Sequence, residues 1–120
     1  MSEIHDILSD LNRVSGVVGS ALLTNDGIMV TSMLGQGFLD DVVAGLSSFL
    51  ISTTRRSLED AGMGGFTRFV LNSTYGKVVL VNIGEAVLVV LTNQFAKLRP
   101  CLGMIQEAAV DLRRVARIHV

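Results

Sequence analysis

Apolar residues near both ends of the chain recur every three or four positions, which predicts an amphipathic helix at each end. The first stripe consists of Ile4, Ile7, Leu8, Leu11 and Val14. The last stripe consists of Leu98, Cys101, Leu102, Ile105, Ala108, Ala109, Leu112 and Val115. Gly16 ends the first helix. Only the first turn of a helix tolerates proline, so Pro100 predicts that the last helix begins at residues 97–99.

Five apolar runs between these helices predict β-strands. The runs occupy residues 17–23, 28–33, 66–71, 77–83 and 86–92. The first two are joined by Thr-Asn-Asp-Gly and the last two by Gly-Glu, which are sequences that favour tight hairpin turns. The runs are apolar at nearly every position, without the alternation of a half-exposed sheet. We therefore expect strands that are covered on both faces.

The longest helical pattern lies between these two groups of strands, at residues 39–61. The large side chains on one side of it are predicted to pack on the sheet; they are Leu39, Val42, Val43, Leu46, Phe49, Leu50 and Thr53. The other side carries the small residues Gly45, Ser48 and Ser52. No charged residue occurs in residues 42–54. Such a track of small residues either faces water or admits a second helix.

The uncharged track predicts a homodimer in which two copies of the long helix pack antiparallel about a two-fold axis near Ser48. Asp41 of one copy then lies near Arg55 of the other. The following strand carries Arg68, which either protects a free sheet edge or lies where that edge pairs with its twin. The residues predicted at this interface are Asp41, Ala44, Gly45, Ser48, Phe49, Ile51, Ser52, Arg55, Arg68 and Val70.

The order of elements predicts a single α+β domain over residues 1–120. Hairpin connections indicate an antiparallel sheet, and strands that are apolar on both faces need helices on both faces. Apolar residues make up 49% of the chain and charged residues 18%, whereas about 25% charged residues is usual. Either the core is unusually large or a partner covers apolar surface.

The charge and hydropathy of the chain exclude two classes of partner. The formal net charge is −1 and aromatic residues make up 5% of the chain, so neither a phosphate-binding stripe nor a base-stacking surface is predicted. No apolar run reaches the ~18–20 residues that cross a bilayer. The acidic N-terminus does not resemble a secretory signal. We therefore expect a cytoplasmic protein that binds neither nucleic acid nor membrane.

Titratable and nucleophilic residues form no catalytic pattern. His5 and His119 lie at opposite ends of the chain, and Cys101 falls in the apolar stripe of the last helix, as a buried hydrophobic residue would. Asp40 and Asp41 are adjacent, which suits a helix N-terminus and not a proton-sharing pair. No metal-ligand spacing or phosphate-loop motif occurs. We expect no enzyme activity, no cofactor and no metal.

The succession of elements resembles the Roadblock/dynein light chain family along nearly the full length of the chain. The resemblance rests on the opening helix, the long helix, and segments 17–27, 76–81, 86–91 and 107–112. It implies a five-stranded antiparallel sheet with the long helix on one face and the N- and C-terminal helices on the other. It also implies a homodimer formed through the long helix and the strand that follows it.

The resemblance further implies a regulatory or scaffolding function. Members of the family bind Ras-like small GTPases or serve as subunits of motor and signalling complexes, and a prokaryotic branch includes a GTPase-activating partner. Residues 97–100 read Lys-Leu-Arg-Pro where the family often has a Gly-Leu step, and the chain stops at Val120 without the extension that some activators use. We therefore expect a non-enzymatic homodimer that binds a Ras-like GTPase, with activation and scaffolding both open.

Overall fold

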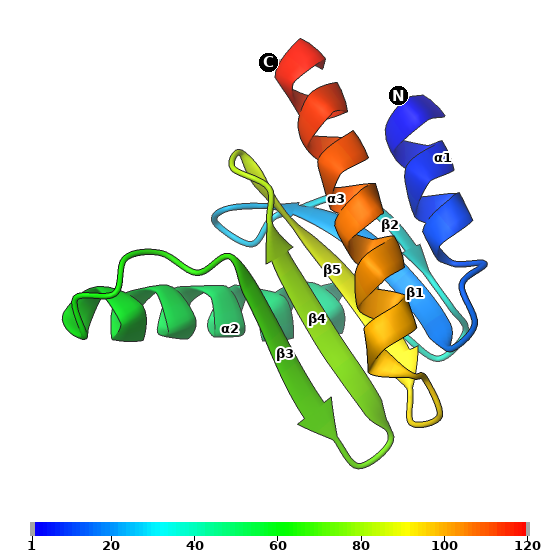
Figure 1. Ribbon diagram of the computed structural model, residues 1–120, viewed down its shortest axis with the longest axis horizontal. Helices are drawn as coiled ribbons and strands as arrows, with labels where there is room; N and C mark the ends of the chain where they lie inside the picture. Colours follow the sequence, from blue (N-terminus) through cyan, green and yellow to red (C-terminus); the bar gives the residue numbers. More distant parts are fainter. Residues whose placement is uncertain (1, 120) are drawn as a thin grey trace.

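The computed structural model describes residues 2–119, with side-chain surroundings for residues 3–115. Three helices and five strands follow one another in the predicted order (Figure 1). They are α1 (Ser2–Leu11), β1 (Val17–Thr24), β2 (Met29–Leu34), α2 (Asp40–Asp60), β3 (Arg68–Ser73), β4 (Gly76–Asn82), β5 (Ala86–Asn93) and α3 (Leu98–His119). The first helix is shorter than predicted, since α1 ends at Leu11 and residues 12–16 form turns and a bend, so the predicted end at Gly16 is wrong. β3 begins two residues later than expected. Phe66 precedes that strand as a buried core residue.

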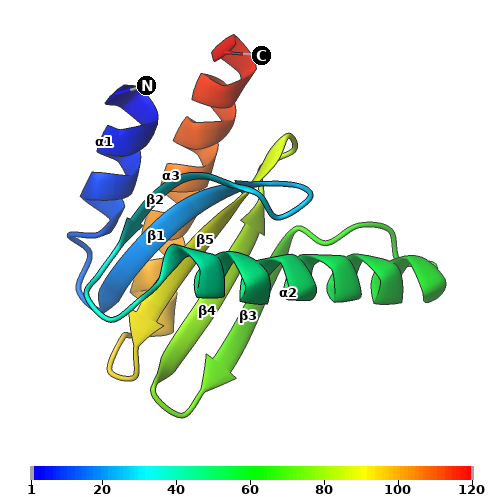
Figure 2. The same cartoon turned by 180° about the vertical axis from the view of Figure 1, so that it is seen from behind.

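The strands form one antiparallel sheet in the order β2-β1-β5-β4-β3. The long helix α2 crosses one face of the sheet, and α1 and α3 lie side by side on the other (Figures 1 and 2). This arrangement confirms the fold that the family resemblance implies. β5 is the central strand, and Val87, Leu88, Val89 and Val90 are all fully buried, which explains why the strand is apolar at every position from Ala86 to Leu91.

Each face of the sheet has its own hydrophobic core. On one face, Leu8 of α1 and Ile105 and Leu112 of α3 pack on Leu22 and Leu88. On the other face, Val43 and Ile51 of α2 pack on the strand residues whose side chains point to that face, which include Leu23, Val87 and Val89. Because burying one such side chain contributes about 1.5–3 kcal/mol, both layers stabilise the sheet.

Two polar side chains fix α1 on its face of the sheet. The Ser20 hydroxyl, which is fully buried, donates a hydrogen bond to Asn12 Oδ1 at 2.7 Å. Asn12 Nδ2 in turn donates to the Met33 carbonyl at 2.8 Å. The turn after α1 is thereby tied to both β1 and β2.

The rotation of α2 about its own axis differs from the prediction. Its buried residues are Val43, Ser47 and Ile51, whereas Leu39, Val42, Leu46 and Phe49 are exposed. The prediction that all of the large side chains pack on the sheet is therefore wrong, although it holds for Val43 and for the half-buried Leu50. The apolar and small residues together span a wide arc of the helix, and only contact with the sheet determines which part of that arc turns inward.

Candidate functional site

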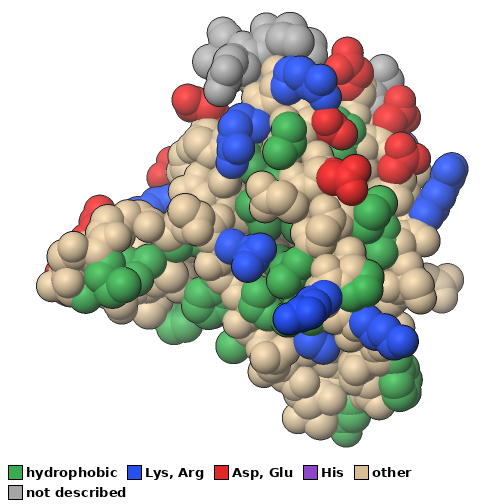
Figure 3. Space-filling view, viewed as in Figure 1, with side chains coloured by type: hydrophobic (Ala, Val, Ile, Leu, Met, Phe, Trp, Pro, Cys, Tyr) green, Lys and Arg blue, Asp and Glu red, His purple; other side chains and the backbone are tan. Residues whose placement is uncertain are grey.

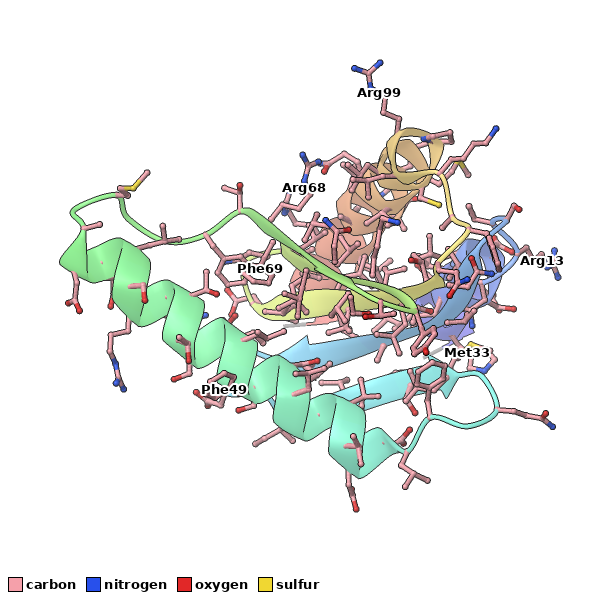
Figure 4. All side chains as sticks on the ribbon, turned by 90° about the horizontal axis from the view of Figure 1, so that it is seen from below. Arg13, Met33, Phe49, Arg68, Phe69 and Arg99 are labelled. Atoms are coloured by element: carbon pink, nitrogen blue, oxygen red, sulfur yellow. The ribbon has the colours of Figure 1, made fainter. Side chains whose placement is uncertain are left out.

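The exposed side of α2 carries a stripe of large apolar residues, called here the α2 face. It consists of Leu39, Val42, Leu46 and Phe49, whose exposed fractions are 68%, 63%, 42% and 65%. The spacing of four and three residues places Val42, Leu46 and Phe49 along one line of the helix, and Leu39 precedes its first turn as the N-cap residue. Phe49 projects away from the sheet (Figure 4). Four such side chains in a row on an uncharged helix surface are typical of a protein-binding site.

The edge strand β3 adjoins the same side of the molecule. β3 is the last strand of the sheet and, within the described residues, pairs only with β4. Phe69, which is opposite Leu80 in the register, packs on the same cluster as Leu50 of α2. Because side chains alternate along a strand, Leu71 points to this side as well, and Val70 points to the α3 side, where it packs. The free edge and the α2 face can therefore meet one partner together.

The turn between β1 and β2 occupies the flank of α2 where the hydrophobic pattern places a second helix. The Ser48 hydroxyl faces the Asp26 carbonyl at 3.5 Å. Gly27 has φ +89°, and a Cβ built on it would lie 2.5 Å from the Ser48 Cβ. Arg55 Nη1 lies 3.5 Å from the Asn25 carbonyl. The small residue at Ser48 thus admits the protein's own turn.

Three residues of the predicted interface therefore need correction. Ile51 is only 1% exposed and belongs to the core. Ser48 and Arg55 contact the protein's own turn. An axis through Ser48 would require a second helix in the place of this turn, so the prediction of close approach at that residue is wrong.

The other predicted interface residues are divided among several surfaces. Phe49 lies on the α2 face, and Arg68 lies exposed at the start of β3. Asp41, Gly45 and Ser52 are exposed on the flank of α2 towards the turn, Ala44 is half-buried there, and Val70 is half-buried on the opposite face of the sheet. Their place in an interface stays a prediction.

The hydrophobic pattern did not identify Leu39, Val42 and Leu46 as surface residues. The i, i+3, i+7, i+10 spacing with Phe49 was present in the sequence, but a stripe of this kind normally marks the buried side. The sequence does not distinguish the two sides of the helix, because Ser47 and Ser48 are equally small and only packing on the sheet shows that Ser47 is the buried one.

The geometry of the α2 face suits binding rather than proton transfer, since its side chains are apolar. Within residues 2–119, no group of three or more His, Cys, Asp or Glu side chains is placed to hold a metal ion. Cys101 is buried, with its Sγ 3.6 Å from the Ser15 carbonyl. In the same range, the helices are too short or too polar to cross a membrane.

Comparison with known proteins adds a family and a set of similar folds. The sequence profile of the Roadblock/LC7 domain matches residues 3–92. The uncharacterized protein MJ0714 of Methanocaldococcus jannaschii is 31% identical over 115 residues, which are 96% of this chain and 92% of that protein.

Solved structures share the fold at low sequence identity. Myxococcus xanthus MglB superposes with a TM-score of 0.90 at 16% identity, covering 98% of this chain and 97% of that one. An MglB described in a tetrameric arrangement gives a TM-score of 0.88 at 19% identity, with 99% and 91% covered. These similarities therefore show that the fold is shared along nearly the whole chain.

Proposed function

The chain belongs to the Roadblock/LC7 family, and from this premise we propose that it is a non-enzymatic homodimer that binds a Ras-like small GTPase. The observation that carries the proposal is the α2 face. A row of four large apolar side chains in water is unfavourable, at about 25 cal/mol for each Å² of apolar surface left exposed. A second copy and a protein partner would cover this surface.

The homodimer would bring the α2 faces and the β3 edges of two copies together. The two helices would cross beside a joined sheet, so that Val42, Leu46 and Phe49 lie between the copies. A stable dimer usually buries about 1,200–2,000 Å², which one helix face and one strand edge can supply together. The MglB of similar fold described in a tetrameric arrangement supports self-association.

The GTPase part of the proposal comes from the family resemblance, because members of the family bind Ras-like GTPases. A structural adaptor is the second candidate, favoured by the start of α3. There Pro100 occupies the first turn after Lys97, where the family often has a Gly-Leu step. Both functions need protein-binding surfaces and no reactive group on this chain.

Substitution of Phe49 tests the dimer. Phe49→Asp puts a charge on the α2 face and should weaken self-association about 100-fold, because each of the two copies loses a central apolar contact. The matched control is Val110→Asp, which puts the same charge on an exposed apolar residue of α3, on the opposite face of the sheet, and should leave the dimer intact. Sedimentation velocity over a range of concentrations measures both. A monomeric wild-type protein, or equal effects of the two substitutions, would contradict the proposed interface.

Hydrolysis assays test the partner. Each Ras-like GTPase of the host is mixed with the protein, and both complex formation and the rate of GTP hydrolysis are measured. Faster hydrolysis identifies an activator, slower hydrolysis an inhibitor, and stable binding with an unchanged rate identifies the adaptor. If no GTPase binds the dimeric protein, the GTPase proposal is wrong and the dimer proposal is unaffected.

A further inference from the structure

A second surface lies between α1 and α3, on the face of the sheet opposite to α2 (Figures 1 and 2). Two adjoining cavities of about 190 and 440 Å³ run along the contact between these helices, and both are lined by Ile7 and Asp111. We call this surface the α1–α3 groove. Its floor includes Leu11, Ala108 and Val115, so the bottom of the groove is largely apolar.

Acidic side chains line both walls of the α1–α3 groove at helical spacing. Glu3, Asp6 and Asp10 follow one another along α1, and Glu107 and Asp111 are one turn apart on α3. Residues separated by three or four positions lie along one side of a helix. The two rows therefore face each other across the apolar floor, and acidic side chains gather over α1 and α3 in Figure 3.

Among the side chains that the structure describes, few basic groups neutralise this negative charge. Arg13 lies 3.8 Å from Asp10, and Arg114 pairs with Asp111. Among the side chains that the structure describes, Glu3, Asp6 and Glu107 have no ion-pair partner. The formal charge of the whole chain is only −1, so the groove is an acidic region on a protein that is nearly neutral.

We propose that the α1–α3 groove binds a cationic amphipathic helix of a partner protein. An apolar stripe on the incoming helix would cover the floor, and lysines or arginines on both sides of that stripe would meet the two acidic rows. The row on α1 spans residues 3–10, which corresponds to about 10 Å or two turns of helix. Charge complementarity of this kind selects the partner and speeds association.

Other occupants fit the charges less well. An anionic membrane surface is repelled by the two rows. A second copy that offered its own α1 and α3 would bring like charges together. The groove also lies on the opposite face of the sheet from α2, so a dimer formed through the α2 face leaves it open, and the two proposals can fail separately.

Peptide binding tests this proposal. The probe is a fluorescent designed helix of leucine and lysine with all its leucines on one side, and its affinity is measured by anisotropy. The test variant is the double substitution Asp6→Lys and Glu107→Lys. The matched control is Glu59→Lys with Asp60→Lys, which makes the same change in net charge at the exposed end of α2. Circular dichroism checks that both variants are folded.

The expected result is that the wild-type protein and the α2 control bind the peptide alike, while the groove variant binds it about tenfold more weakly. A peptide with glutamate in place of lysine should not bind. Amide chemical shifts of the wild-type protein should change on α1 and α3. The proposal is overturned if the groove variant binds as well as the control, if the glutamate peptide binds equally, or if the shifts move elsewhere.

Discussion

At the scale of single residues, the most informative position is Ser47. Its side chain is fully buried between α2 and the sheet, and its hydroxyl has no hydrogen-bond partner among the residues that the structure describes. A buried polar group without a partner costs about 1–3 kcal/mol. A serine here costs stability but provides the small volume that the close approach of helix and sheet requires.

Ser47→Ala should therefore stabilise the protein by about 1 kcal/mol, since alanine keeps the small volume, removes the unsatisfied hydroxyl and favours the helix. Urea denaturation measures the free energy of unfolding. Ser52→Ala is the control, because Ser52 is exposed on the same helix and should gain only the smaller helix-propensity term. A loss of stability in Ser47→Ala would show that the hydroxyl has a role that the buried geometry does not explain.

At the scale of secondary-structure elements, β3 has one paired edge and one free edge. The Asn82 amide donates to the Thr67 carbonyl, so the backbone groups of Thr67 point towards β4. The backbone N–H and C=O groups of successive residues point alternately to the two sides of a strand. Those of Phe69 therefore point towards β4, as those of Thr67 do, and the N–H of Val70 points to the free edge. Proline at these two positions therefore removes different hydrogen bonds.

Val70→Pro should leave the domain folded but prevent two β3 edges from pairing, since proline is tolerated where the lost N–H faces outward on an edge strand. Phe69→Pro, one residue earlier, removes a bond to β4 and should destabilise the domain itself by about 3 kcal/mol. Sedimentation velocity and thermal unfolding separate the two effects. A dimer of unchanged affinity in Val70→Pro would mean that the copies do not share a sheet.

At the scale of the whole molecule, the order of elements and the two-sided burial of the sheet could be predicted from the sequence. Hairpin turns and continuous apolar runs identify the strands, and Pro100 lies in the first turn of α3 as predicted. The rotation of α2 could not be predicted, because Val43 and Leu46 are equally apolar and only the sheet distinguishes them. The contact of Ser48 with Gly27 depends on residues that are distant in sequence, so helical periodicity cannot reveal it.

The groove between α1 and α3 could not be predicted from the sequence for a related reason. Its acidic rows are split between the two ends of the chain, with Asp6 in the first helix and Glu107 in the last. In the sequence, each row looks like the solvent-exposed side of an ordinary amphipathic helix. The rows come together only because both helices pack on the same face of the sheet. Local patterns identify helices reliably, but they do not show which surfaces become neighbours.

The central place of β5 has a consequence for the order in which the chain can fold. The hairpins β1–β2 and β3–β4 are each local, but the sheet joins them only through β5, which pairs with β1 and β4. During synthesis, both hairpins therefore emerge from the ribosome before the strand that connects them. Until residue 93 has emerged, the nascent chain consists of separate marginal hairpins, and closure of the sheet must wait for a contact between residues far apart in sequence.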